Sequence, residues 1–313
     1  IDHPQANFDQ SYQSIVDLVV NNAVKIQFPL VVDGAQCIID VLKMKMYKFK
    51  PEGGKPEKLE IPEDQKEMAD YLHNELVEKA AENDEELMEL YFDKGTLNED
   101  EMRLGIQKGM LNHELFPVFC VSAINDMGTG RLMGFIDNVA PAAADLKPEQ
   151  SLEGNEVICK ASEPTALFIF KTFHEPNIGQ ITFFKVKSGE VKQNDRLRNS
   201  RNNELENLNQ LFIMDGKKRH SVEKLTAGDI GATLKLKNTE TNDTLRDPGT
   251  EITIKPIIFP EPRIRKAVEA VNKKDEEKLH EFLKKMHSQD PTIEMKYSKE
   301  LKQQILSCQG ELH

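Results

Sequence analysis

The residues of this chain best suited to catalysis or metal binding are its eight histidines and four cysteines. The histidines stand at positions 3, 73, 113, 174, 220, 280, 287 and 313, and their spacing matches no metal-ligand motif. A lone histidine such as His174 is more often a surface or core residue than a catalyst. The cysteines, Cys37, Cys120, Cys159 and Cys308, include no C-x-x-C pair, so the sequence predicts neither a zinc site nor a disulfide framework. We assign no catalytic residue and no metal site.

Gly53-Gly54-Lys55, flanked by Pro51 and Pro56, resembles part of a phosphate-binding loop. A P-loop requires G-x-x-x-x-G-K-[ST], because this spacing wraps backbone N–H groups around a phosphate. The chain lacks that spacing, and it also lacks the G-x-S-x-G and H-E-x-x-H motifs of hydrolases. We interpret the segment as an exposed turn.

Length and composition indicate an ordinary soluble globular protein of two or three domains. The chain has 313 residues, of which 38 % are hydrophobic and 30 % charged. No apolar run is long enough for a membrane span, so we expect a cytoplasmic protein with reduced thiols and no membrane role. Ile1-Asp2 and Gly310 to His313 read as motifs cut through the middle, and we expect an internal piece of a longer protein.

Charge is divided unevenly along the chain. Residues 1–160 contain 15 Lys and Arg against 30 Asp and Glu, whereas the remainder contains 26 against 23. An acidic first part fits a basic protein partner, and a weakly basic second part fits nucleic acid. Solvation of an ordinary surface explains the same distribution.

In the first part, hydrophobic spacing predicts a helix from Phe8 to Ala23 and then a hairpin. The hairpin strands would be Phe28–Val32 and Cys37–Val41, joined by the turn Asp33-Gly34.

Helical composition extends from Ile61 to Asp93, and a break is expected at Asn83-Asp84. The predicted buried face contains Met68, Tyr71, Leu72, Leu76 and Ala80. Thr96 to Glu99 fits a capping box for a further helix that ends near Asn112.

The apolar run Pro117–Val121 predicts a strand covered on both faces, followed by Ser122-Ala123 and an amphipathic helix over residues 132–139. A strand that leads through a loop into a helix is α/β architecture, in which ligands bind at the carboxyl ends of strands.

The second part follows a linker over residues 141–159 and contains short strand candidates. They span residues 166–173, 179–187, 195–198, 206–214, 230–236 and 252–254, and they predict a closed or nearly closed β-barrel. Basic side chains gather here: Lys185, Lys187, Lys192, Arg196, Arg198, Arg201, Lys217, Lys218 and Arg219. They predict either a solvated barrel face or a surface that binds a phosphate backbone.

Residues 261–313 show a strand at 263–268, a helix from Lys273 to His287, and strands at 292–297 and 304–308. We expect Leu279, Phe282, Leu283 and Met286 to face inward from the helix. A β-α-β-β order is the beginning of a ferredoxin-like domain.

Five motifs occur in order along the second part. They are Phe183 to Gly189 with Asn194-Asp195, Ala227 to Ile230, Asn242 to Leu245, Phe259 to Pro262, and Gly310 to His313. Together they closely resemble translation elongation factor G, and the resemblance covers the whole chain. Asp2, ahead of Ala6-Asn7-Phe8, resembles the end of that family's N-K-x-D motif, and Ser122-Ala123 resemble its S-A motif.

The resemblance implies a multidomain protein with α/β, β-barrel and α+β parts. Residues 1–145 would be the C-terminal part of a P-loop-type GTPase domain with an insert at about 27–115. Residues 146–260 would be the translation-factor β-barrel, and residues 261–313 a truncated ferredoxin-like third domain.

It also implies GTP or GDP as the ligand, with Mg²⁺ in the intact protein. Asp2 would accept two hydrogen bonds from guanine, and the backbone N–H of Ala123, in the Ser122-Ala123 motif, would donate to the guanine oxygen. Because the family's P-loop, switches and catalytic histidine are absent from this sequence, we expect this piece to be inactive and to bind no nucleotide by itself.

The implied partners are the ribosome, through small-subunit ribosomal RNA and the stalk protein, and tRNA for the intact factor. The implied function is GTP-dependent translocation of tRNA and mRNA. A divergent ribosome-binding paralogue with altered GTP hydrolysis and a tetracycline-type ribosomal protection factor are the alternatives.

One departure from the family pattern lies beside the base-recognition motif. The family has Gly-Ser-Ala-Phe-Lys-Asn where this chain has Val121 to Asp126, so a lysine is lost and an aspartate gained. The change either weakens nucleotide binding or is neutral because the lysine position is exposed.

Overall fold

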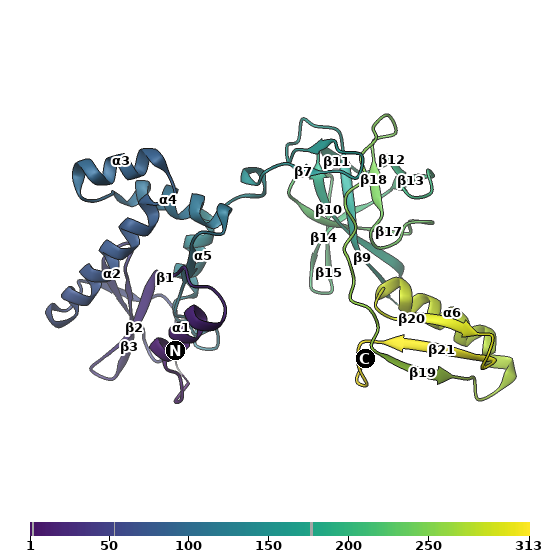
Figure 1. Cartoon of the computed structure of the whole chain (residues 1–313), viewed down its shortest axis with the longest axis horizontal. Coiled ribbons are helices and arrows are strands. Elements are labelled where there is room, and N and C mark those ends of the chain that lie inside the picture. The colour runs from purple at the N-terminus through teal and green to yellow at the C-terminus, as the bar shows by residue number, and fades with distance from the viewer. Residues whose placement is uncertain (2, 53, 176–177) are drawn as a thin grey trace. The chain divides into compact units, whose positions relative to one another are not determined.

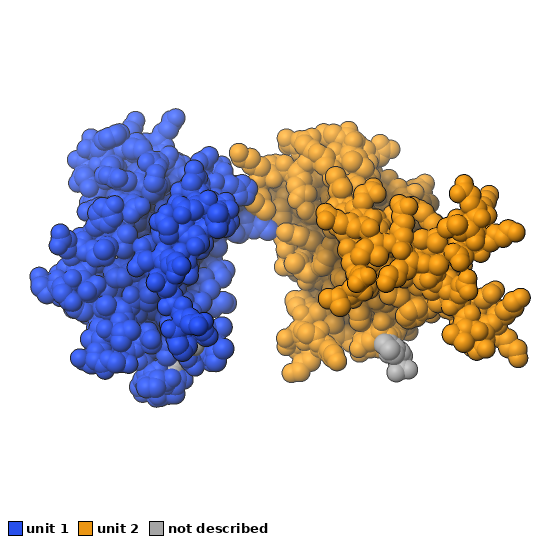
Figure 2. Space-filling model, turned by 60° about the horizontal axis from the view of Figure 1, so that its bottom comes forward, with its two compact units in different colours: residues 1–145 blue, residues 146–313 orange. Residues whose placement is uncertain are grey.

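The computed structural model describes residues 1, 3–52, 54–175 and 178–313, and it divides into two compact units. Unit 1 comprises Ile1–Asp145 and unit 2 comprises Leu146–His313 (Figure 2). Among the residues described, no helix combines the length and the apolar character needed to cross a membrane.

Two short parallel strands form the α/β part of unit 1. Strand β1 (Ala23–Lys25) pairs with β6 (Phe116–Val118), and helices α1 (Phe8–Leu18) and α5 (Thr129–Asn138) lie beside them (Figure 1). The predicted first helix ends earlier than expected, because residues 23–25 pair with β6 instead of continuing the helix. The predicted strand at 117–121 is shorter, and β6 is only half-buried. Burial on both faces was therefore a wrong expectation.

A four-stranded antiparallel sheet follows β1. Its strands are β2 (Gln27–Val32), β3 (Ala35–Asp40), β4 (Lys45–Lys48) and β5 (Glu57–Leu59), in that order. The predicted hairpin is confirmed, since β2 pairs with β3 across Asp33 and Gly34. Both turn residues have positive φ, 50° and 76°, as a two-residue type I′ turn requires.

Three helices complete this part: α2 (Glu63–Ala81), α3 (Glu85–Lys94) and α4 (Glu99–Asn112). The predicted break is confirmed, because the Asp84 side chain caps α3 and pairs with Lys108. Lys108 also holds the pKa of the Asp84 carboxyl below its ordinary value. The predicted capping box is wrong by two residues, since Asn98 and Glu101 form it.

The predicted buried face of α2 was rotated from the true one. Met68 and Tyr71 are 53 % and 66 % exposed. The buried side chains are Ala69, Leu72, Leu76, Val77, Ala80 and Ala81. Small residues occupy this face because α4 packs closely against it.

The central element of unit 2 is a curled eight-stranded sheet in the order β13-β12-β18-β9-β10-β17-β14-β15 (Figure 1). Its strands are β9 (Ala166–Glu175), β10 (Gly179–Ser188), β12 (Asp195–Asn199), β13 (Leu205–Leu208), β14 (Leu211–Asp215), β15 (Lys218–Val222), β17 (Ile230–Leu234) and β18 (Thr244–Arg246). Two small pairs accompany it: β7 (Glu149–Gln150) with β8 (Glu156–Val157), and β11 (Glu190–Lys192) with β16 (Lys224–Thr226).

The strand predictions for this part need four corrections. The candidate at 206–214 is two strands, β13 and β14, and strands β15 and β18 were missed. Residues 252–254 form no strand, although Ile252 and Ile254 are buried. The expected linker contains β7 and β8, preceded by a 3₁₀ turn at Ala143–Asp145. Within the described residues no ladder joins β13 to β15, so the sheet is a half-barrel and not a closed barrel.

The last part has the predicted β-α-β-β order. Strand β19 (Ile264–Val268) precedes a 3₁₀ turn (Lys273–Asp275) and helix α6 (Glu276–Gln289); β20 (Glu294–Ser298) and β21 (Gln303–Cys308) follow. The antiparallel sheet has the order β19-β21-β20. Leu283 is buried as expected, but Phe282 is largely exposed, so its inward orientation was wrong.

The close packing of α2 on α4 gives a stability prediction. A Cβ added at Gly105 of α4 would overlap the backbone carbonyl of Ala80 on α2. Because two helix backbones cannot easily separate, Gly105→Ala should destabilise this region by about 1–3 kcal/mol. Hydrogen exchange of α2 and α4 amides, read by mass spectrometry, measures the effect.

Gly134→Ala on α5 is the matched control, because no atom lies within 4 Å of the added Cβ. It should leave the α2 and α4 amides unchanged and stabilise α5 by about 0.5–1 kcal/mol. Equal exchange of α2 and α4 in both variants would contradict the packing argument.

Candidate functional site

The predicted base-recognition segment is a tight loop between β6 and α5. Ser122 is buried, and its backbone exchanges two hydrogen bonds of 2.9 Å with Met127. Its hydroxyl accepts a hydrogen bond from the backbone N–H of Asn125 at 3.2 Å. The Ser122 side chain therefore shapes the loop from inside and does not face solvent.

Ala123, at the exposed turn of this loop, presents its backbone N–H outward. Among the described residues, no group accepts a hydrogen bond from that N–H. The backbone nitrogen of Ile1 donates to the carbonyl of Val121 at 3.2 Å, so the start of the chain lies against the loop. Asp2, the third predicted site residue, lies outside the described residues.

The substituted positions of the loop have different roles. Ile124 is 93 % exposed. Asp126 adopts a left-handed backbone with φ of 49°, and its carboxylate accepts a hydrogen bond from the hydroxyl of Thr129, the first residue of α5. The aspartate gained in this chain therefore ties the loop to the helix that follows it.

A buried ion pair supports the start of α5. Asp40, at the end of β3, is 2 % exposed, and the Arg131 guanidinium donates to its Oδ2 at 2.7 and 3.1 Å. The backbone N–H of Lys43 donates to the other carboxylate oxygen at 2.9 Å. The guanidinium also stacks 5.0 Å from the ring centroid of Tyr47. These contacts join the four-stranded sheet to α5 directly beneath the loop.

A cavity of about 560 Å³ opens at the same end of α5. Lys55, Asp126 and Arg131 are its charged lining residues, whereas Ser122 and Ala123 do not line it. The cavity and the exposed N–H of Ala123 are therefore neighbouring but separate features.

Cys120 precedes the loop and lies in the core of unit 1. Burial raises the pKa of its thiol to about 12, so the reactive thiolate is negligible at neutral pH. The thiol serves packing and not chemistry.

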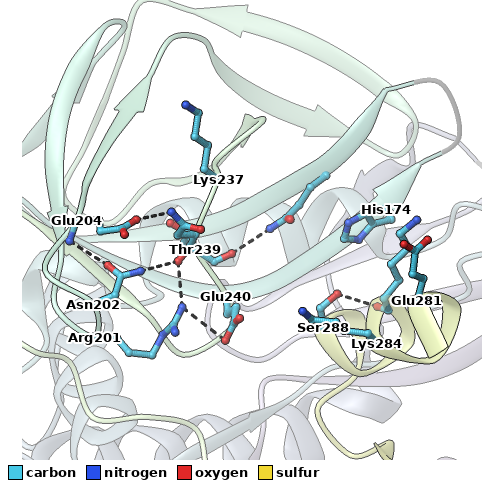
Figure 3. Close-up of a pocket in the computed structure, with 13 residues that line it drawn as sticks. His174, Arg201, Asn202, Glu204, Lys237, Thr239, Glu240, Glu281, Lys284 and Ser288 are labelled. Carbon is cyan, nitrogen blue, oxygen red and sulfur yellow. Dashed lines mark hydrogen bonds and ion pairs between the residues drawn. The ribbon is translucent and has the colours of Figure 1, made fainter. Parts of the chain in front are cut away.

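Unit 2 contains a polar crevice of about 630 Å³ between the curled sheet and α6 (Figure 3). His174 and Gln180 come from the β9–β10 hairpin, and other residues come from the loops after β12 and β17. Glu281, Lys284, Lys285 and Ser288 come from α6. The hydroxyl of Thr172 on β9 donates to the Ser288 carbonyl, so sheet and helix are also linked directly.

The loop wall of the crevice is fixed by a buried carboxylate. Asp243 is 3 % exposed and binds Arg201 through Nε at 2.7 Å and a terminal nitrogen at 3.0 Å. It also accepts hydrogen bonds from Asn199 and from the backbone N–H of Glu240. Arg201 is therefore held in place by its partners and is not a mobile surface cation.

The Nδ1 atom of His174 is buried without a hydrogen-bond partner in the described part of the chain. Burial, together with the positive charge of Lys285, lowers the pKa of the imidazole. The ring is therefore neutral at pH 7.

The structure divides the predicted basic surface. Lys187, Lys192 and Arg201 form ion pairs with Glu149, Glu190 and Asp243, and Arg198 donates to the carbonyl of Asn203. Exposed cations without an acidic partner among the described residues are Arg196, Lys217, Lys218 and Arg219. Arg196 is on β12 and the other three are at the β14–β15 turn, near opposite ends of the strand order.

Comparison with known proteins bears on unit 2 most directly. Residues 164–247 match the family model of elongation factor G domain 2, and residues 259–313 match that of Elongation Factor G, domain III. A crystal structure of a protein from Thermus thermophilus shares the fold of the chain with a TM-score of 0.84 and 21 % identity. The match covers 98 % of this chain and 44 % of that chain, so the present chain spans less than half of its length.

A curled β-sheet domain followed by a β-α-β-β domain, both matching translation-factor models, defines a translation-factor-like protein. These are the second and third domains of elongation factor G, and the chain belongs to that type through them. The resemblance named from the sequence motifs is confirmed. Unit 1 lies outside both matched ranges and is related to the solved structure by fold.

The buried ion pair beneath the loop gives a second prediction. Arg131→Met leaves the Asp40 carboxylate buried without its charged partner, which should destabilise unit 1 by about 3 kcal/mol. Hydrogen exchange of β3 and α5 measures this loss. Asp40→Asn combined with Arg131→Met should recover part of it, and a double variant as unstable as the single one would disprove the pairing argument.

A third prediction concerns His174. Its folded-state pKa is lowered, so the unfolded state binds more protons as the pH falls through the ordinary value of about 6.5. Its contribution to stability is complete above that pH and declines below it. NMR titration of the imidazole should give a midpoint below 6.5; a midpoint at or above that value would contradict burial in the crevice.

Proposed function

We propose that the protein to which this chain belongs is an elongation factor G-like translational GTPase, which binds the ribosome and promotes GTP-dependent movement of tRNA and mRNA. The observation that carries this proposal is the succession of second- and third-domain matches over residues 164–247 and 259–313. A cytoplasmic location follows from that role. The domain boundaries proposed are 1–145, 146–260 and 261–313.

In this proposal unit 1 is the C-terminal part of a GTPase domain. Residues 27–115 leave the pair of parallel strands after β1 and return before β6, which is the topology of an insert. This acidic insert would bind the stalk protein of the ribosome.

Asp2, Ser122 and Ala123 would bind the guanine base of GTP or GDP. The geometry of the loop is compatible with this role, because the Ala123 N–H is exposed and available to a carbonyl oxygen, while Ser122 holds the loop in shape. Phosphate binding and Mg²⁺ would depend on residues outside this sequence, which contains no P-loop. We therefore expect no micromolar GTP binding by this chain in calorimetry.

Ribosome-dependent GTP hydrolysis by the intact protein is the decisive test. Strong stimulation by ribosomes would support a working translational GTPase. Ribosome binding without turnover would instead identify a divergent paralogue and overturn the translocation proposal.

The curled sheet would contact small-subunit ribosomal RNA through its unpaired cations. We predict that Arg196→Glu with Arg198→Glu weakens cosedimentation with ribosomes. The logarithmic slope of binding against salt concentration should flatten by about one for each phosphate that the sheet no longer binds. Lys278→Glu with Lys299→Glu makes the same change of charge on exposed residues of the third domain and is the control. Equal binding by the two double variants would sink the RNA-surface assignment.

A further inference from the structure

The crevice between the curled sheet and α6 carries positive charge that no acidic partner neutralises. Lys237, Lys284 and Lys285 line it, and none forms an ion pair with any residue the structure describes (Figure 3). Other lysines of unit 2, such as Lys187 and Lys192, have carboxylate partners within 2.6 Å. Three ammonium groups around one cavity repel each other unless an anion binds between them.

The acidic groups of the crevice are mostly engaged elsewhere. Glu240 lies 3.5 Å from Arg201, which is already bound to Asp243. Glu204 accepts a hydrogen bond from the side chain of Asn238. Glu281 is the remaining carboxylate, and its side chain has no hydrogen-bond or ion-pair partner among the described residues. The unbalanced groups are therefore three cations and one hydrogen-bond acceptor.

His174 adds a neutral group on the opposite wall. Its Nδ1 atom is buried and has no partner in the described structure, and an unsatisfied buried polar atom costs about 1–3 kcal/mol. A ligand group within reach of this nitrogen would remove that cost. The cavity, at about 630 Å³, lies in the size range of small-molecule sites and is larger than a bare phosphate requires.

We propose that the crevice binds a ribose-phosphate unit. The phosphate lies between Lys237, Lys284 and Lys285, whose ammonium groups donate charge-assisted hydrogen bonds to its oxygens. A sugar hydroxyl donates to the carboxylate of Glu281, which explains why an acceptor stands among the cations. His174 completes its hydrogen bonding to the same ligand.

Binding here would join two parts of unit 2. Lys237 belongs to the sheet domain, and Lys284 and Lys285 belong to α6, so one phosphate links the sheet to the helix in addition to the Thr172–Ser288 hydrogen bond. The inference goes beyond the proposed function, because it requires neither GTP nor ribosomes. Each proposal can fail while the other stands.

The test uses the whole 313-residue chain and three probes: inorganic phosphate, adenosine 5′-monophosphate and a decamer of uridylate. Binding is measured by calorimetry, and the NMR signals of the His174 ring report whether the probe enters the crevice. We expect the nucleotide to bind at least tenfold more tightly than phosphate and to shift the His174 signals. Equal affinity for phosphate and nucleotide would overturn the role given to Glu281.

Lys237→Gln with Lys285→Gln should weaken nucleotide binding at least tenfold. Lys278→Gln with Lys299→Gln removes the same charge from exposed positions outside the crevice and should bind normally. Equal weakening in both double variants, or no shift of His174 with any probe, would refute the site. Tighter binding of the decamer than of the mononucleotide would identify the ligand as RNA backbone, and the reverse would identify a free nucleotide.

Discussion

Buried carboxylates fix the loops on which both candidate sites depend. Asp40, Glu206 and Asp243 are almost fully withdrawn from water, and an unpaired carboxylate in such a place would cost several kcal/mol. Each is therefore surrounded by donors. Asp40 binds Arg131 at the start of α5, and Asp243 binds Arg201. Glu206 accepts hydrogen bonds from the backbone N–H groups of Lys237 and Asn238 and from the hydroxyl of Thr239. The positions of the loops follow from these pairings more than from apolar packing.

Features encoded by neighbouring residues were predictable from the sequence. Asp33-Gly34 specified its hairpin because both positions needed a positive φ, and Asp84 marked a helix boundary because its side chain caps the next helix. The β-α-β-β order of the last part was also clear, since each element carries its own periodicity. The capping box was misplaced by two residues, because Thr96 and Asn98 offer equivalent local signals and only the packed structure selects one.

Features that depend on distant residues were not predictable. The buried face of α2 is set by the approach of Gly105 on α4, so the larger side chains Met68 and Tyr71 are turned outward. Asp40 and Arg131 are 91 residues apart, and nothing in either neighbourhood indicates the pair. The crevice is assembled from segments between His174 and Ser288, whose separate residue types looked like ordinary surface. Whether the sheet closes depends on pairing between its edge strands, which hydrophobic spacing does not encode.

The altered loop of unit 1 shows how a substitution can change side chains while leaving recognition to the backbone. The hydroxyl of Ser122 accepts from the backbone N–H of Asn125, and the carboxylate of Asp126 accepts from Thr129. Both side chains are occupied in shaping the loop and anchoring it to α5. The group that remains directed outward is the backbone N–H of Ala123, which any residue other than proline would supply at that position. In the proposed nucleotide site, discrimination at this loop therefore depends on its geometry, and through it on the Asp40–Arg131 pair beneath.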